Sequence, residues 1–241
     1  MQARTGSKRL PGKMLMKIGK FSVLEIIIKR LKKCKKIKKI IIATTKNTKD
    51  DAIVKIAKKN KVFSFRGSTN DLVSRYYFAA KKFKVNPIVR FPGDNLFPCP
   101  NEIDKIINFF LKKNQNIFCS NIEPIKKSGY PTGIGAEVFS FQNLEKIFLN
   151  ERNNQKREHI HLNFINYKKG IPANKKFCEI FTIKAIKRIK YPKIVLHIDY
   201  LNEFLLLKKV FLNFNRINIQ IDKVLKFIDK NKHEYHSLYK K

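Results

Sequence analysis

Acidic residues and long apolar runs are both scarce in this sequence. The 241 residues contain 18 Asp and Glu against 53 Lys and Arg, which gives a formal net charge of +35. No apolar run reaches the roughly 18 residues that a membrane-spanning helix needs. No apolar segment typical of a secretory signal follows the N-terminus, so we expect a cytoplasmic protein without a membrane partner.

Cysteine is also sparse, and its spacing excludes the usual cysteine frameworks. The four cysteines are scattered along the chain and form no CxxC pair: Cys34, Cys99, Cys119 and Cys178. This spacing argues against a cysteine metal site and against a disulfide framework. It agrees with a reducing cytoplasm, where thiols stay free.

The positive charge consists mostly of lysine, 43 of the 53 cationic residues. A strongly basic chain is typical of nucleic-acid binding. Here, however, the lysines are spread over the whole sequence and accompany many Ile, Asn and Phe, residues with AT-rich codons. We therefore attribute the excess mainly to genome composition and expect no nucleic-acid partner. A small anionic substrate such as a nucleotide or a sugar acid fits the same charge.

Apolar patterns with helical spacing alternate with short apolar runs typical of buried strands. We expect helices at 23–34, 50–60, 70–83, 101–113, 157–167, 200–211 and 219–230. We expect strands at 39–43, 61–65, 87–91, 116–121, 135–141, 177–184 and 194–198. Asn70 is the expected N-cap of the third helix. This alternation predicts an α/β fold with a mostly parallel, Rossmann-like sheet between helical layers.

The chain has no internal repeat and no linker-like segment, so we expect one domain over residues 1–241. Within it, residues 1–212 form the predicted α/β core and residues 213–241 a C-terminal helical appendage. The lysine-rich end, 230–241, is expected to be frayed.

The first thirteen residues carry the strongest site signal. Two glycines, a serine, a proline and four cations precede the first expected helix, in the stretch Gln2–Lys13 (QARTGSKRLPGK). Glycine lets a ligand approach the backbone, and exposed N–H groups with Lys and Arg side chains suit a polyphosphate. The spacing matches neither a P-loop nor a GxGxxG motif. On spacing alone, a basic surface loop remains an equal alternative.

This stretch resembles the QARxGSxRLPGK signature of the cytidylyltransferases that activate acidic sugars. That family includes the acylneuraminate and 3-deoxy-manno-octulosonate enzymes, and the resemblance is strongest to the spore-coat polysaccharide SpsF-type branch. Six further segments resemble the family's motifs in the same order: IIATTKNTKDD at 41–51, FRGS and RYY at 65–68 and 75–77, RFPGD at 90–94, YP to EVF at 130–139, REH at 157–159 and the stretch 196–204. Each motif is weak alone, but seven in order cover nearly the whole chain.

The resemblance implies attack of a sugar hydroxyl on the α-phosphate of CTP, with loss of pyrophosphate and help from Mg²⁺. It implies a nucleotide site made by Arg4, Gly6, Ser7, Arg9, Lys13, Arg66 and Arg75, in which Lys13 and Asp94 are catalytic. Asp94 and Asp199 each follow a predicted strand, at the edge where open α/β sheets bind ligands. Two such carboxylates suit Mg²⁺, although each could instead cap a helix.

For the acidic sugar, the resemblance implies contacts from Glu137, Arg157 and His159. Each has a structural alternative: Glu137 could simply pair with a basic residue, and a lone histidine on a helix is often structural. The resemblance also implies a homodimer, with an interface around Glu137–His159.

The sequence departs from the family pattern at several points. The family's hydrophobic first strand, which lies at the centre of its sheet, is missing ahead of Gln2. We expect either a start further upstream, in which case restored codons would raise the soluble yield, or a remnant. Two family acids are replaced by Thr132 and Gly135, and Ser74 stands where an Asp is usual. These departures leave open a nucleotidyltransferase that uses another NTP or a sugar phosphate, and a non-catalytic basic nucleotide- or nucleic-acid-binding protein.

Overall fold

The computed structural model describes residues 1–113, 116–122, 128–166, 169–174 and 177–240. Its helices are α1 (Val23–Leu31), α2 (Asp51–Lys59), α3 (Leu72–Phe83), α4 (Pro100–Leu111), α5 (Phe141–Asn150), α6 (Asn154–Glu158), α7 (Leu201–Phe214) and α8 (Ile221–Lys230). Its principal strands are β3 (Ile41–Thr45), β4 (Phe63–Gly67), β5 (Ile88–Arg90), β6 (Ile117–Ser120), β7 (Glu137–Phe139) and β10 (Glu179–Phe181). Two small hairpins complete the set: β1 (Lys17–Ile18) with β2 (Phe21–Ser22), and β8 (Ile165–Asn166) with β9 (Ile171–Pro172). The α/β class is confirmed.

Local capping explains where two of the helices begin. Ser22 and Glu25 form a capping box at the start of α1, in which each side chain bonds the other residue's backbone N–H. Asp71 caps α3, because its Oδ1 accepts from the Ser74 N–H at 2.9 Å. The prediction that Asn70 caps this helix was wrong by one residue.

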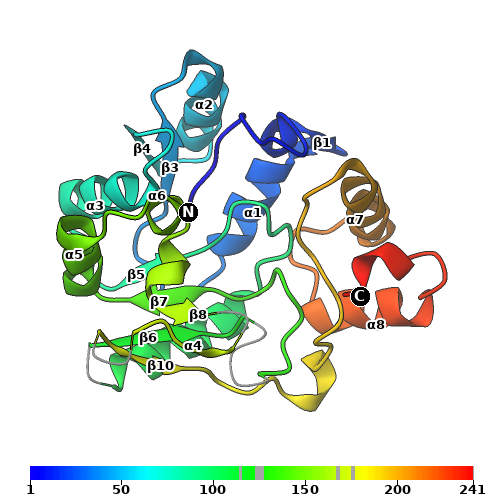
Figure 1. Ribbon diagram of the computed structural model, residues 1–241. Helices are drawn as coiled ribbons and strands as arrows, with labels where there is room; N and C mark the ends of the chain where they lie inside the picture. Colours follow the sequence, from blue (N-terminus) through cyan, green and yellow to red (C-terminus); the bar gives the residue numbers. More distant parts are fainter. Residues whose placement is uncertain (114–115, 123–127, 167–168, 175–176, 241) are drawn as a thin grey trace.

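The sheet is divided into two parts. One part pairs β3 with β4 in parallel, and the other has the order β10-β6-β7-β5. β10 and β6 are parallel as expected, but β7 runs antiparallel to both β5 and β6. Helices α3 and α5 lie together on one side of the molecule, and α7 and α8 lie on the other (Figure 1).

The N-terminal residues lie in the gap between the two parts of the sheet (Figure 1). Gln2 forms a parallel bridge with Ala43 of β3. The N–H of Ala43 donates to the Met1 carbonyl at 2.8 Å, and the N–H of Ala3 donates to the Ala43 carbonyl at 3.3 Å. Residues 1–3 therefore pair in parallel with the middle of β3.

The C-terminal segment packs on the same core as the rest of the chain. Val224, Leu225 and Ile228 of α8 are fully buried in the large apolar cluster that also holds α1 and α4. The expected boundary at residue 212 lies inside α7, which runs to Phe214. The division into a core and an appendage therefore stays a prediction. The expected fraying after residue 230 was wrong: Leu238 is buried and its carbonyl accepts from the Val195 N–H at 2.7 Å.

Three other elements differ from the sequence-based expectation. The helix expected at 157–167 is replaced by α6 and a short 3₁₀ helix, because His159 leaves helical geometry (φ −119°, ψ 78°). The segment 194–198 forms isolated bridges rather than a strand. α5 was not expected, and it begins where Ser140 accepts from the Asn143 N–H. Among the described residues, no helix is long and apolar enough to cross a bilayer.

Candidate active site

The basic N-terminal loop is tied to the sheet by one buried carboxylate. Asp50 is 1% exposed, and its Oδ1 accepts from both the N–H and the hydroxyl of Thr5 at 2.7 Å. Its Oδ2 accepts from the N–H and hydroxyl of Thr45, the last residue of β3. Burial alone would raise the pKa of Asp50, but these four hydrogen bonds outweigh it and lower the pKa. The loop therefore starts from a fixed point at the carboxyl end of β3.

The loop turns around the carbonyl of Thr5, which accepts from the N–H groups of Ser7 and Gly12. Gly12 has φ +70°, a left-handed conformation that favours glycine, and it directs the chain into the 3₁₀ helix that begins at Lys13. Within the described part of the chain, the N–H groups of Gly6, Lys8 and Arg9 have no hydrogen-bond partner. Such donors beside cationic side chains suit phosphate oxygens.

Two acidic residues far apart in the sequence are brought to one edge by pairing of their backbones. The N–H of Ile198 donates to the Asp94 carbonyl at 3.0 Å, and Asn95 bridges His197. On the other side of this turn, Gly93 packs directly against the backbone of Gln2. Only glycine fits there, because a Cβ at position 93 would lie 2.0 Å from the Gln2 carbonyl oxygen. The turn is thus wedged between the N-terminal segment and residues 196–198.

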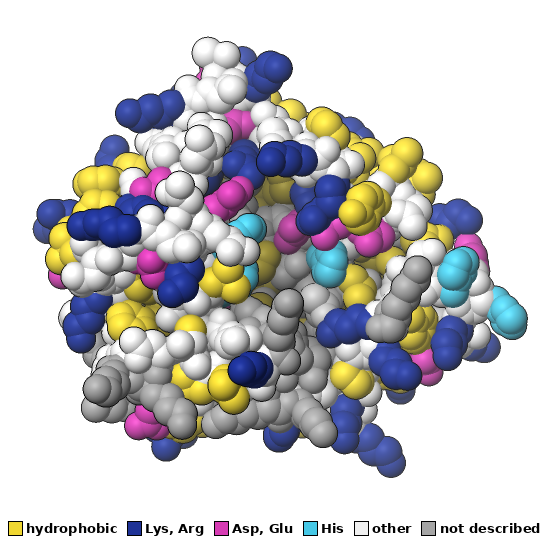
Figure 2. Space-filling model, in the orientation of Figure 1, with side chains coloured by type: hydrophobic (Ala, Val, Ile, Leu, Met, Phe, Trp, Pro, Cys, Tyr) yellow, Lys and Arg dark blue, Asp and Glu magenta, His cyan; other side chains and the backbone are white. Residues whose placement is uncertain are grey.

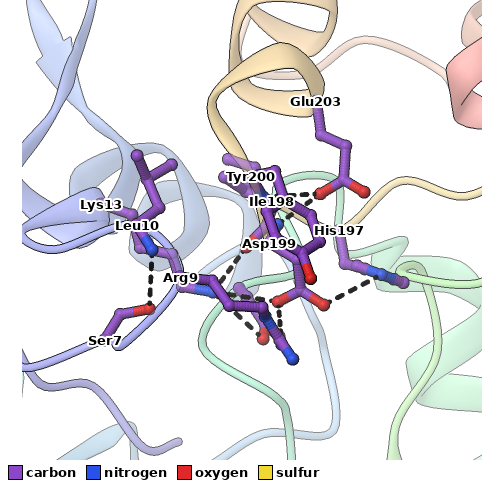
Figure 3. Close-up of polar contacts among 10 residues, drawn as sticks. Ser7, Arg9, Leu10, Lys13, His197, Ile198, Asp199, Tyr200 and Glu203 are labelled. Carbon is purple, nitrogen blue, oxygen red and sulfur yellow. Dashed lines mark hydrogen bonds and ion pairs between the residues drawn. The ribbon is translucent and has the colours of Figure 1, made fainter.

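Arg9 and Lys13 converge on these two carboxylates (Figure 3). Lys13 Nζ lies 3.5 Å from Asp94 Oδ2 and 3.4 Å from Asp199 Oδ1, and it donates to the Ile198 carbonyl. Arg9 Nη2 lies 2.6 Å from Asp199 Oδ1. The structure therefore brings together the predicted catalytic pair, Lys13 and Asp94, and both predicted metal ligands.

The electrostatics of the cluster favour its charged state. Burial by itself would raise the pKa of Asp199, but the hydrogen bond from Arg9 and the charges of Lys13 and His197 hold it below its ordinary value. The same hydrogen bond raises the pKa of Arg9. The Arg9 side chain remains 52% exposed, so the cluster is open to a charged ligand. Acidic, basic and histidine side chains gather around a hollow near the middle of this face (Figure 2).

His197 belongs to the cluster, although sequence reasoning gave it no role. Its Nε2 lies 3.6 Å from Asp199 Oδ2, on the side of the carboxylate opposite Arg9 (Figure 3). Two residues apart in extended chain point to the same face, so the spacing of His197 and Asp199 was a usable signal. Asp50 was also missed as a loop anchor, because nothing in the sequence links it to Thr5.

A second group of predicted site residues lies around the start of α3. Arg4 Nη1 donates to the Thr69 carbonyl at 3.0 Å, and its Nη2 lies 3.5 Å from Glu158. Arg157 binds Asp71 through Nε and Nη2, at 2.9 and 2.6 Å. Arg4 and Arg157 are therefore both held by carboxylates, in a group separate from the Lys13 contacts.

The two remaining nucleotide-site arginines differ from each other in their environment. Arg66 is fully engaged: it pairs with Asp51 and donates to the carbonyls of Thr45 and Asn47. Arg75 is 3% exposed, and its Nε has no hydrogen-bond partner among the described residues. Burial lowers the pKa of Arg75. A buried guanidinium with unused donors is suited to an acceptor supplied by a ligand.

The predicted sugar contacts each have a different partner within the protein. Glu137, on β7, is 1% exposed and forms a buried ion pair with Arg90 of β5 at 2.5 Å. His159 is exposed at the end of α6, with its ring 5.8 Å from that of His161. Their assignment to the sugar stays a prediction, as does that of Arg157.

The donor set at the cluster is chemically suited to Mg²⁺, which takes one or two carboxylates and completes its shell with phosphate oxygens and water. Asp94 and Asp199 supply two carboxylates that face one ammonium. No group of three or more His, Cys, Asp or Glu side chains that could hold a metal occurs among the described residues. Any metal here would therefore need ligands from a substrate as well as from the protein.

Residues 1–213 match the family described as cytidylyltransferase. The chain belongs to the cytidylyltransferase family. It is accordingly a nucleotidyltransferase, which agrees with a cationic loop facing two carboxylates at a sheet edge.

Two curated proteins and two solved structures illustrate the relationship. An uncharacterized protein of Methanocaldococcus jannaschii is 36% identical over 231 residues, 96% of this chain and 89% of that protein. The spore coat polysaccharide biosynthesis protein SpsF of Bacillus subtilis is 28% identical over 88% of this chain and 84% of its own. A cytidylyltransferase structure from Leptospira borgpetersenii serovar Hardjo-bovis superimposes with a TM-score of 0.84 at 32% identity, covering 97% of this chain and 94% of that one. CMP:2-keto-3-deoxy-manno-octonic acid synthetase, solved with CTP, has a TM-score of 0.61 at 11% identity over 88% of this chain and 96% of that one, which shows a shared fold.

Proposed function

We propose that this cytidylyltransferase moves CMP from CTP to a hydroxyl of an acidic sugar and releases pyrophosphate, in the synthesis of a surface polysaccharide or glycan. The observation that carries the proposal is the cluster in which Arg9 and Lys13 face Asp94 and Asp199. The choice of an acidic sugar is supported by the synthetase that shares the fold, and the link to a polysaccharide is supported by the spore-coat relative.

In this reaction the sugar hydroxyl oxygen bonds to the α-phosphorus, and the bond from that phosphorus to the bridging oxygen breaks. The electron pair of the broken bond leaves with pyrophosphate, and the hydroxyl loses its proton. Negative charge therefore accumulates on phosphate oxygens, and positively charged donors placed beforehand lower the barrier.

The residues of the loop fit the task of holding the triphosphate. The loop supplies the exposed Arg9 guanidinium, the unused N–H groups of Gly6 and Lys8 and, at its end, the Lys13 ammonium. Lys13 is 9% exposed and held by three acceptors, so its ammonium has a fixed position. A fixed cation stabilises developing charge without the cost of rearranging during reaction.

Asp94 and Asp199 would hold Mg²⁺, which when bound neutralises phosphate charge and orients the triphosphate. Because both carboxylates contact Lys13 and Asp199 also contacts Arg9 and His197, their positions are fixed before any ligand arrives. Positioning the α-phosphate in line with the sugar hydroxyl is the main work left to the protein.

The test measures pyrophosphate release by the full chain with Mg²⁺ and a panel of sugar acids. CTP is compared with UTP, ATP and GTP as the nucleotide substrate. We expect release with CTP and at least one sugar acid, and its loss in Asp94→Asn with an unchanged unfolding temperature. Release with another nucleotide but not CTP would overturn the base assignment. Release with neutral sugar phosphates alone would overturn the acidic acceptor.

A further inference from the structure

Two neighbouring polar residues of α3 are buried between the end of β4 and the ion pair that joins β5 to β7. Arg75 is 3% exposed and Tyr76 is 5% exposed. The Arg75 side chain packs against β4, because a Cβ at Gly67 would lie 3.0 Å from the Arg75 Cγ. Tyr76 lies close enough to Arg90 and Glu137 for both charges to act on its hydroxyl.

Gln2 lies on the same face of the sheet. It is bridged to Ala43 of β3, and Ala43 packs in the same apolar cluster as Tyr76. The Gln2 N–H lies near the Tyr76 hydroxyl, but outside hydrogen-bonding geometry. Gln2, Arg75 and Tyr76 therefore form one polar cluster, although they come from distant parts of the sequence.

This polar cluster has hydrogen-bonding atoms that the rest of the described chain does not use. The Arg75 guanidinium forms no hydrogen bond and no ion pair with the described residues. Within the same part of the chain, Tyr76 Oη and Gln2 Oε1 are buried atoms without a partner. Buried polar atoms are nearly always hydrogen-bonded, so three such groups together point to a ligand.

The polar cluster also has a positive charge without a matching anion. Burial lowers the pKa of Arg75, and the nearby charge of Arg4 lowers it further. The Arg4 side chain is 33% exposed, and its Nη2 lies 3.5 Å from the Glu158 carboxylate. A carboxylate can therefore approach the exposed member of this arginine pair. The buried member, Arg75, still lacks a counter-charge, which is costly inside a protein.

The unused groups define the chemistry of the ligand. Arg75 can only donate, so it requires an acceptor, and Gln2 Oε1 can only accept, so it requires a donor such as a hydroxyl. Burial raises the pKa of Tyr76 to about 12, so its hydroxyl keeps its proton and can also donate. A sugar acid supplies a charged acceptor and hydroxyl donors together. The base and ribose of a nucleotide supply no charge to offset a buried guanidinium.

We propose that the polar cluster is the subsite for the acidic sugar, in which Arg75, with Arg4 beside it, binds the sugar carboxylate while Gln2 accepts from a sugar hydroxyl. The assignment rests on the proposed transfer of CMP to an acidic sugar. It moves Arg4 and Arg75 from the nucleotide, where the family resemblance places them, to the acceptor. It also gives a role to Tyr76 and Gln2, for which none was predicted. The triphosphate stays with the contacts around Lys13.

The test measures binding of 3-deoxy-manno-octulosonate and N-acetylneuraminate to the full chain by calorimetry, with CDP and Mg²⁺ present so that no transfer occurs. Each acid is compared with its methyl ester, which keeps the hydroxyls and removes the charge. We expect the chain to bind at least one acid and to bind its ester at least ~10-fold more weakly. Arg75→Met should weaken binding of that acid by at least ~30-fold, and Tyr76→Phe by about 5- to 10-fold.

Two variants on the same helix are matched controls. Tyr77→Phe removes a hydroxyl that donates to Glu145 at 3.1 Å, and Lys82→Met removes an exposed cation. Both should bind the acid as tightly as the parent chain does. Arg75→Met should unfold at the same temperature as the parent chain or at a higher one, because removal of an unpaired buried charge relieves a cost.

Thermal stabilisation by CTP separates this assignment from the proposed function. We expect CTP to stabilise Arg75→Met and Tyr76→Phe as much as it stabilises the parent chain. If Arg75→Met loses the CTP effect and keeps its affinity for the acid, Arg75 belongs to the nucleotide and the assignment is wrong, while the transfer of CMP stands. Equal binding of acid and ester, a lower unfolding temperature for Arg75→Met, or no binding of either acid would also overturn the assignment. Arg75-dependent binding of an acid by a chain that releases no pyrophosphate would keep the subsite and overturn the proposed function instead.

Discussion

At the scale of single residues, Lys13 has more contacts to the acidic cluster than any other cation described in the candidate site. Its ammonium contacts Asp94, Asp199 and the Ile198 carbonyl from a nearly buried side chain. We expect Lys13→Met to lower kcat for pyrophosphate release by about 10²- to 10³-fold, the usual effect of losing one donor to a developing negative charge. Lys20→Met is the control, because Lys20 is exposed outside the cluster; an equal loss in both variants would refute the role of Lys13.

The buried carboxylate of Asp50 should make the stability of the protein depend on pH. Its folded-state pKa is lowered, so its contribution is complete above the unfolded value of about 3.9 and is lost as the pH falls through the folded value. Asp50→Asn should destabilise the protein by about 1–3 kcal/mol at pH 7, because buried donors lose their charged acceptor. The difference in unfolding free energy between the variant and the parent protein should become smaller below about pH 4.

Unfolding temperatures of both proteins between pH 7 and pH 3 provide the measurement. Asp51→Asn is the matched control, since the Asp51 side chain is half exposed and pairs only at the surface with Arg66. Surface pairs contribute at most about 1 kcal/mol. A gap for Asp50→Asn that stays constant down to pH 3 would contradict the account of the loop anchor.

At the scale of elements, the pairing of β5 with β7 depends on a buried ion pair. Arg90 and Glu137 are opposite each other in the ladder and are both at most 5% exposed. Glu137→Gln should destabilise the protein by about 3–5 kcal/mol, because it leaves a buried guanidinium without its counter-charge. The double variant Arg90→Met with Glu137→Met should recover most of that loss. Denaturant unfolding measures both.

The same pair separates two roles for Glu137. If Glu137 only joins the strands, the double variant recovers stability and keeps the KM for the sugar. A KM that rises in the double variant while stability is recovered would assign Glu137 to the substrate, as the family resemblance implies.

The sequence predicted most of the helices because apolar spacing and capping residues are local. It located α2, α3, α4, α7 and α8 to within a few residues. It failed at 157–167 and 194–198, where His159 breaks the helix and long-range bridges replace a regular strand. Tertiary contacts decide which strands pair and in which direction. The antiparallel direction of β7 could therefore not be predicted from the apolar pattern of the sequence.

The site was predictable to a similar extent and for similar reasons. The convergence of Arg9, Lys13, Asp94 and Asp199 follows from loops at the same sheet edge, and it was expected. The partners of Arg4, Arg66 and Arg157 were not, because ion pairs between distant surface segments leave no local signal. The role of Asp50 depends on a contact with Thr5 that only the folded chain creates.

At the scale of the whole molecule, the net charge of +35 sets the response to salt. Like charges at this density repel one another in the folded state, and salt screens them over about 10 Å at 0.1 M. We expect the unfolding temperature to rise between 0.05 and 0.5 M potassium chloride, over the range where the affinity for a nucleotide falls. Calorimetry and a nucleotide titration at each salt concentration check both trends, and stability that falls with salt would contradict the repulsion argument.

If the N-terminal loop and the two aspartates form a CTP site, CTP should stabilise the protein against thermal unfolding. A ligand at about 100 times its dissociation constant adds about 2.7 kcal/mol, several degrees for a chain of this length. We expect CTP with Mg²⁺ to raise the unfolding temperature more than UTP, ATP or GTP does, and we expect no rise with CTP in Lys13→Met. Equal shifts with all four nucleotides, or a CTP shift that survives Lys13→Met, would contradict the assignment of a CTP site.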